Sequence, residues 1–249
     1  MPKPSPVVLP HELERSSVVA NNTMNRERGL AGVNSYTREL GFDPLEFLTG
    51  RPDPAWLDLC SGEGRALRQA AAELPATTTL TGVDLVGPLA PTPAPPVLKE
   101  IIASVTSWAP TRTYDLVTCV HGLHYVGDQL GLLSRAAAWL TPNGLLAAHF
   151  DPDSIRRPDG SPAGRPALAA LRAAGFNYSP GHHRLTLRGA RTLTLPFRYT
   201  GADPTAGPNY TGQPAVASHY EDHEPHEHGE HQSTRAPEHQ STRAPERRP

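Results

Sequence analysis

The stretch that decides the fold is Leu57-Asp58-Leu-Cys-Ser-Gly62-Glu-Gly64-Arg-Ala-Leu67. It begins inside a short apolar run, residues 56–60, which predicts a buried strand, and it ends inside a helical stretch, residues 65–74. Two glycines two positions apart let the backbone of the turn approach a ligand closely. The stretch therefore predicts a strand, a glycine turn and a helix, with a ligand at the turn.

The carboxylate of Asp58 indicates which ligand the turn holds. It lies in the strand, four positions before Gly62, and we expect it to project toward the turn. A carboxylate there would repel a pyrophosphate but attract an ammonium or sulfonium group. Leu67 also stands where dinucleotide-binding turns have their third glycine, and Asp84 ends the next strand, where an acid accepts hydrogen bonds from a ribose. The predicted ligand is a nucleoside-like cation without phosphates.

Beyond this turn the chain alternates strand-like and helical runs. Strands are predicted at residues 79–84, 100–104, 114–120 and 145–150, and helices at residues 128–140 and 166–175. Two β-like runs, residues 183–188 and 191–198, are joined by Gly189-Ala190 and predict an antiparallel hairpin. The pattern is typical of an α/β fold with an open, mostly parallel sheet, whose ligands bind beyond the carboxyl ends of the strands.

These features resemble the class I S-adenosylmethionine-dependent methyltransferases. The first motif of that family, acid-x-x-x-Gly-x-Gly, is matched by Asp58, Gly62 and Gly64. The fourth strand of the family typically begins with an aromatic residue and an aspartate, as Tyr114-Asp115 does here. The segment after that strand often reads Leu-His-aromatic, as Leu123-His124-Tyr125 does. The resemblance implies a Rossmann-like, seven-stranded, mostly parallel sheet with an antiparallel terminal hairpin and helices on both faces.

The same resemblance implies S-adenosylmethionine as cofactor. The residues implied to bind it are Asp58, Cys60, Ser61, Gly62, Gly64, Asp84, Leu85, Ser104, Val105, Cys119 and Val120. Among them Asp84 holds the ribose and Leu85 lies against the adenine. Ser104 departs from the pattern of the family, whose third strand commonly ends in Gly-Asp-Ala. The acid of that motif accepts a hydrogen bond from the adenine amino group, and a hydroxyl accepts this bond more weakly. Five prolines within residues 86–97 also shorten or replace the family's second crossover helix.

Methyl transfer from a sulfonium is an in-line displacement that needs close approach in a dry pocket. The candidate catalytic residues are His121, just past the fourth strand, and Tyr36, in an N-terminal helix that would fold over the site. For both, the alternative of a structural role stays open. We expect His124 to be a buried structural histidine, Cys60 and Cys119 to be small apolar residues, and no metal ion in the site.

Composition excludes other classes. The 249 residues include 23 Lys and Arg against 25 Asp and Glu, a formal charge of -2, which argues against nucleic-acid and anionic-membrane partners. No apolar run approaches the roughly 20 residues that span a bilayer. Two cysteines cannot form a disulfide framework. With no secretory signal in the sequence, we expect a cytoplasmic protein.

We expect three parts. They are a flexible N-terminal segment at residues 1–28, a methyltransferase domain at 29–218 with its core at 55–200 and a helical cap at 29–50, and a disordered His-rich tail at 219–249. The tail contains an eight-residue repeat, and Met24 offers an alternative start. The tail histidines could bind a divalent metal, but a solvated repeat is the interpretation we favour.

The leading hypothesis is a methyltransferase that moves a methyl group to a small-molecule acceptor by in-line displacement. The alternative is a methyltransferase-like binding or regulatory module without catalysis, which Ser104 and the proline-rich stretch suggest. A nicotinamide-dependent oxidoreductase is disfavoured by Asp58 and by the missing third glycine. The sequence specifies neither the acceptor atom nor the oligomeric state.

Overall fold

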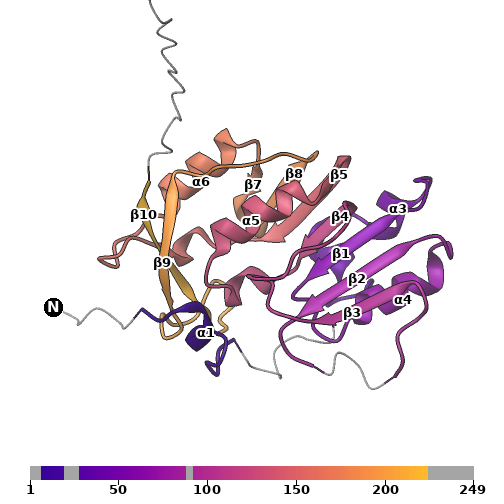
Figure 1. The fold of residues 1–249 in the computed structure, drawn as a ribbon, viewed down its shortest axis with the longest axis horizontal. Coiled ribbons are helices and arrows are strands. Elements are labelled where there is room, and N and C mark those ends of the chain that lie inside the picture. Colours follow the sequence, from indigo (N-terminus) through magenta and orange to yellow (C-terminus); the bar gives the residue numbers. More distant parts are fainter. Residues whose placement is uncertain (1–6, 20–27, 88–91, 224–249) are drawn as a thin grey trace, which may run out of the picture.

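A computed structural model describes residues 7–19, 28–87 and 92–223. It is built around a seven-stranded sheet with the order β3-β2-β1-β4-β5-β8-β7 (Figure 1). The strands are β1 (Ala55–Leu59), β2 (Thr79–Asp84), β3 (Leu98–Ile102), β4 (Tyr114–Cys119), β5 (Leu140–His149), β7 (Asn177–Ser179) and β8 (Arg184–Arg188). β1 to β5 are parallel, β8 runs antiparallel to β5, and β7 runs antiparallel to β8. This confirms the predicted fold class.

Helices cover both faces of this sheet. The helices are α2 (Tyr36–Leu40), α3 (Pro44–Leu48), α4 (Arg65–Glu73), α5 (Gln129–Ala138) and α6 (Gly164–Ala173), with short 3-10 turns η1 (Gly122–Tyr125), η2 (Pro152–Ser154) and η3 (Pro180–His182). Trp56 of β1 belongs to the core with α2, α3 and α4, whereas Leu57 belongs to the core with α5 and α6. Consecutive strand residues point to opposite faces, so both faces of β1 are buried.

The terminal hairpin is present, but the prediction of its second strand was wrong. β8 pairs with β7, and not with residues 191–198. The turn after β8 bonds back to β5, because the amides of Gly189 and Ala190 donate to the carbonyls of Gly144 and Thr141. These bonds direct the chain past the start of β5, so it does not reverse along β8. Of the predicted run at 191–198, only Phe197 and the residue after it lie in a strand, which is β9 (Phe197–Asp203).

A second, three-stranded sheet was not predicted. Its order is β6-β10-β9, where β6 is Ile155–Arg156 and β10 is Ala217–Asp222. The predicted start of the tail at residue 219 was therefore wrong. Tyr220 anchors this end of the chain: its hydroxyl donates to Asp128 Oδ1 over 3.0 Å and accepts from the amide of Leu130 over 2.9 Å. Residues 224–249, with the repeat, lie outside the described residues.

The N-terminal residues 7–19 were expected to be flexible, and here too the prediction was wrong. They include α1 (Pro10–Leu13), which Figure 1 shows beside β9. Val8 and Ala202 of β9 exchange two backbone hydrogen bonds, of 2.8 and 3.2 Å. Leu13 is buried in a small cluster with Ala202 and Val216. One backbone pair and one buried leucine thus fix a segment whose composition is polar and proline-bearing. Met24 lies outside the described residues.

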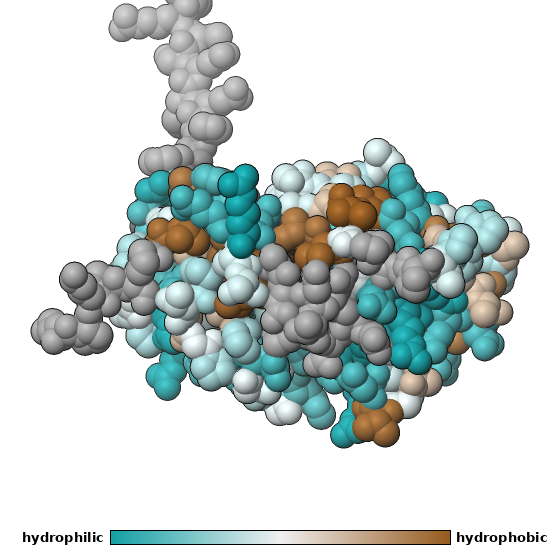
Figure 2. All heavy atoms as spheres, turned by 90° about the horizontal axis from the view of Figure 1, so that it is seen from below, coloured by the Kyte–Doolittle hydropathy of each residue, from teal (hydrophilic) through white to brown (hydrophobic). Residues whose placement is uncertain are grey.

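The large apolar side chains on the described surface are scattered. Within the described ranges, no helix is both long and apolar enough to cross a bilayer. The face drawn in Figure 2 is mainly hydrophilic, with hydrophobic residues in small, separated areas. Exposed large apolar side chains are few: Val7, Leu9, Val33, Ile102 and Tyr210. Such scattered residues are ordinary on a protein surface.

Candidate active site

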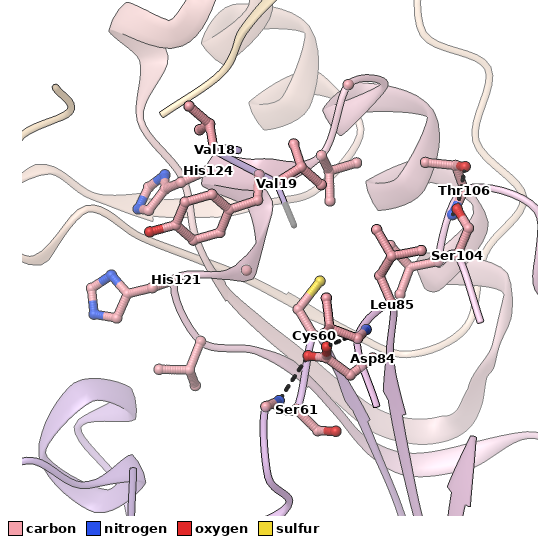
Figure 3. Close-up of a pocket in the computed structure, with 18 of the residues that line it drawn as sticks. Val18, Val19, Cys60, Ser61, Asp84, Leu85, Ser104, Thr106, His121 and His124 are labelled. Atoms are coloured by element: carbon pink, nitrogen blue, oxygen red, sulfur yellow. Dashed lines mark hydrogen bonds between the residues drawn. The ribbon is translucent and has the colours of Figure 1, made fainter. Parts of the chain in front are cut away.

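A cavity of about 670 Å³ lies at the carboxyl ends of the parallel strands. Its volume falls within the roughly 300–1,000 Å³ of small-molecule sites, and its place is the one expected for an open α/β sheet. In Figure 3, His121 and His124 lie at one end of the cavity and Ser104 and Thr106 at the other, with Asp84 between them. The two ends are therefore made by different elements.

The glycine turn after β1 is fixed by Asp84. The carboxylate of Asp84 accepts hydrogen bonds from the amide of Gly62 over 2.8 Å and from the amide of Val86 over 3.0 Å. Gly62 and Gly64 have φ values of 60° and 66°, a left-handed conformation that glycine adopts without strain. Asp84 lines the cavity, and the hydrogen bonds from these two amides fix the orientation of its carboxylate in the cavity wall.

Asp58 lies beneath the cavity and does not line it, contrary to the expectation that it projects toward the ligand. Its side chain is buried, and its two oxygens accept hydrogen bonds of 2.6 Å from the hydroxyls of Tyr36 and Thr118. Burial raises the pKa of Asp58 to about 7. Trp56 Nε1 donates to Thr118 over 2.8 Å, so four buried side chains form one hydrogen-bonded network.

Tyr36 lines the cavity, but its hydroxyl is engaged with Asp58. Burial and the neighbouring Asp58 carboxylate raise the pKa of Tyr36 well above its usual range. The phenol therefore stays protonated at neutral pH and cannot act as a general base. Tyr36 therefore forms part of the cavity wall, and its hydroxyl fixes the side chain of Asp58 by a hydrogen bond.

His121 follows β4 and has a left-handed backbone, with φ of 59°. Its Nε2 lies 3.1 Å from Glu39 Oε2, and Nε2 of His149, at the end of β5, lies 3.3 Å from the same oxygen. Arg28 donates to the other oxygen of Glu39 over 2.6 Å. Hydrogen bonds to the two histidines hold the pKa of Glu39 well below its usual range, so its carboxylate is ionised. Burial lowers the pKa of His149 to about 4.

Tyr210 connects His121 with His124. Its hydroxyl lies 3.4 Å from His121 Nδ1 and 3.4 Å from His124 Nε2, and its ring stacks on His183 with 3.7 Å between centroids. Burial lowers the pKa of His124 to about 3, which makes it a neutral, buried histidine. The loop after β9 thus contributes to the cavity; Thr211 also lines it.

A family profile described as a methyltransferase domain matches residues 33–168, which is more than half of the chain. The chain belongs to this methyltransferase family. The match confirms the resemblance seen in the sequence, and the matched residues run from before Tyr36 through the glycine turn and His121 to α6.

Solved structures similar to this methyltransferase domain are distant. The plantazolicin methyltransferase BpumL with a monoazolic desmethylPZN analog and SAH is 15% identical, with a TM-score of 0.39 over 45% of this chain and 44% of that one. CalS10, an amino pentose methyltransferase from Micromonospora echinaspora with bound SAM, is 22% identical, with a TM-score of 0.33 over 42% and 46%. Coclaurine N-methyltransferase with N-methylheliamine and SAH is 20% identical, with a TM-score of 0.33 over 42% and 33%.

The chain spans less than half the length of each of these structures. No protein of curated function matches the methyltransferase sequence significantly.

Most of the residues predicted to bind the cofactor line the cavity: Cys60, Ser61, Gly62, Asp84, Leu85, Ser104, Val105 and Val120. Gly64 and Cys119, like Asp58, do not line it. Cys119 is buried against Cys60, and a hydrogen bond with Cys119, together with burial, raises the pKa of the Cys60 thiol. Both cysteines are free thiols.

Sequence reasoning missed Glu39, His149 and Glu14. A signal existed for His149, because it is the polar residue of the apolar run at 145–150 and stands where parallel strands end. Glu39 had no such signal, since it is an ordinary polar position of a short helix. Glu14 lies in a segment that we expected to be flexible.

The ligand atoms of Glu39, His121 and His149 lie within 4.8 Å of one another, which is a spacing that could hold a metal ion. Two observations favour a hydrogen-bonded cluster instead. The two histidine rings are stacked, with 10° between their planes and 4.1 Å between centroids, so one ion cannot lie in both ring planes. Glu39 also accepts from the guanidinium of Arg28, whose positive charge opposes a cation.

Proposed function

We propose that the protein binds S-adenosylmethionine in this cavity and moves its methyl group to a small-molecule acceptor. The observation that carries the proposal is the charge of the cavity beside the glycine turn. Among the described residues, the lining includes four carboxylates, those of Glu14, Glu39, Asp84 and Asp128, against the one guanidinium of Arg28. Such a lining favours a cationic ligand over a phosphate-bearing one.

The proposed arrangement places the ribose at Asp84 and the methionine part along the glycine turn. Asp84 is positioned by the amides of Gly62 and Val86, so its carboxylate is oriented before a ligand arrives. A charged acceptor strengthens hydrogen bonds from the two ribose hydroxyls. Leu85 and Val105 supply apolar surface for the adenine ring.

Bound in this cavity, S-adenosylmethionine would supply a methyl group on a sulfonium, which the acceptor would take by in-line displacement, with the electrons of the carbon–sulfur bond left on sulfur. His121 is the proposed general base. The ionised carboxylate of Glu39 lies 3.1 Å from Nε2 and stabilises the tautomer that carries its proton there. Nδ1 then keeps its lone pair, which would take the acceptor's proton once the acceptor replaces the hydroxyl of Tyr210 at this nitrogen.

Calorimetric titration of the full chain with S-adenosylmethionine and S-adenosylhomocysteine tests the proposal. We expect both to bind and Asp84→Ala to weaken binding about 100-fold, because it removes a charged acceptor and the anchor of the glycine turn. Asp159→Ala, at an exposed aspartate, is the matched control and should bind like the parent protein. If neither compound binds the parent protein, the proposal is wrong.

The second part of the test measures S-adenosylhomocysteine formation with a panel of phenols, amines, azoles and thiols. Turnover with any of them supports the enzyme and identifies the acceptor class. Binding without turnover across the whole panel favours the alternative, a methyltransferase-like binding or regulatory module.

A further inference from the structure

Glu14 brings a carboxylate to the end of β3, where the sequence has the neutral residue Ser104. The hydroxyl of Ser104 donates to Glu14 Oε1, and the hydroxyl of Thr106 donates to the same oxygen over 3.2 Å. Ser104 and Thr106 are themselves in contact at 2.7 Å. All three line the cavity, at the end away from His121.

We infer that Glu14 is a cofactor-binding residue whose carboxylate accepts the adenine amino group, and that residues 10–19 form one wall of the adenine site. The inference rests on the proposed function, and it assigns a binding role to a segment outside the matched methyltransferase domain.

The segment that carries Glu14 is held in place on both sides of it. Upstream, Val8 is paired with Ala202 of β9, and Leu13 is 2% exposed. Downstream, Val18 and Val19 line the cavity and pack against the cluster of Leu13, Ala202 and Val216. The position of the Glu14 carboxylate is therefore set by the fold and not only by its own hydrogen bonds.

The order of groups along the cavity is that of a nucleoside. Figure 3 shows Asp84 and Leu85 between Ser104 and the two histidines, with Val19 across from them and Val18 nearer His124. A ribose at Asp84 thus places its base toward Ser104 and its sulfur-bearing arm toward His121. The base then lies among apolar side chains, and its edge meets the carboxylate of Glu14.

One oxygen of Glu14 remains for the base. Ser104 and Thr106 both donate to Oε1, and Oε2 has no hydrogen-bond partner among the described residues. A carboxylate accepts hydrogen bonds and donates none, so this site favours a base that presents an amino group. Hypoxanthine, which presents a carbonyl oxygen at the same position, would leave two acceptors facing each other.

The test compares S-adenosylhomocysteine with S-inosylhomocysteine, in which a carbonyl oxygen replaces the amino group and N1 carries a hydrogen, by calorimetric titration of the full chain. The parent protein should bind the adenosyl compound about 30-fold more tightly. Glu14→Gln should reduce this preference to about fivefold or less, because an amide also offers a donor to the carbonyl of hypoxanthine. Glu14→Ala should reduce it similarly.

Glu12→Ala is the matched control, since Glu12 is exposed in α1, two residues before Glu14, and does not line the cavity. It should keep the parent preference. The ratio of two dissociation constants does not depend on the fraction of folded protein. The inference is overturned if both Glu14 variants keep the full preference for the adenosyl compound. If the parent protein binds neither compound, the proposed function itself fails, which is a different result.

Discussion

The two ends of the cavity are built in different ways. At the proposed cofactor end, the glycine turn follows β1 and Asp84 ends β2, and a hydrogen bond from the amide of Gly62 to the Asp84 carboxylate joins them. At the His121 end, Glu39 comes from α2, His149 from β5 and Tyr210 from the loop after β9. The first end is encoded by neighbouring motifs, and the second by residues that only the folded chain brings together.

This difference separates two tasks. A cofactor shared across a family can be bound by strand ends whose order does not change. An acceptor that differs between enzymes requires side chains from segments that can vary. We therefore expect changes at the His121 end to affect turnover and changes at the Asp84 end to affect cofactor binding.

The largest expected effect is at His121. His121→Gln should lower the turnover number about 10²–10⁴-fold, because it removes the proposed general base, while the dissociation constant of S-adenosylhomocysteine changes less than about twofold. Steady-state rates at saturating cofactor, together with calorimetry, measure both quantities. His182→Gln, at an exposed histidine of η3, should leave both unchanged. A large loss of cofactor affinity in His121→Gln would show that the two ends act as one unit.

The next effect concerns Asp58, which lies beneath the cavity and joins Tyr36 to Thr118. Its pKa of about 7 exceeds the usual value near 4, so the folded chain holds this proton more tightly than the unfolded chain does. The stabilisation from this proton is complete below about pH 4 and is lost as the pH rises to about 7. Asp58→Asn removes that dependence.

Urea unfolding at several pH values measures the effect. Relative to the parent protein, the free energy of unfolding of Asp58→Asn should rise by on the order of 3 kcal/mol between pH 4 and pH 7. The lowered pKa values of the buried histidines His124 and His149 also make the folded protein less stable as the pH falls. Both proteins contain these histidines, so their contribution cancels in the comparison. A difference that does not vary with pH would contradict the expectation.

The smallest effect concerns Gly122, where the start of η1 packs against the end of β1. A methyl group there would collide with the side chain of Cys60 and lie 2.8 Å from Cys119 Sγ. Gly122→Ala should lower the free energy of unfolding by about 1–3 kcal/mol. Gly181→Ala, where no atom lies within 4 Å of the added carbon, should change it by less than about 0.5 kcal/mol. Equal stability of the two variants would show that η1 can move away from β1.

What could be predicted from the sequence follows the same division. The glycine turn, Asp84 and the parallel strands were predictable because each depends on residues close together in the chain. The pairing of residues 191–198 was not, since backbone bonds from Gly189 and Ala190 to β5 decide the path. Glu39 was not predictable either, because its chemistry depends on two histidines from other parts of the chain, one just after β4 and one at the end of β5.

The pairing of Val8 with Ala202 has a consequence for synthesis on the ribosome. The segment that carries Glu14 is translated long before its partner strand, β9, which comes after all seven strands of the main sheet. A nascent chain that ends before β9 already contains the glycine turn and Asp84, yet it lacks the strand that holds the N-terminal segment in place. The segment that carries Glu14 can thus reach its final position only after β9 has been made.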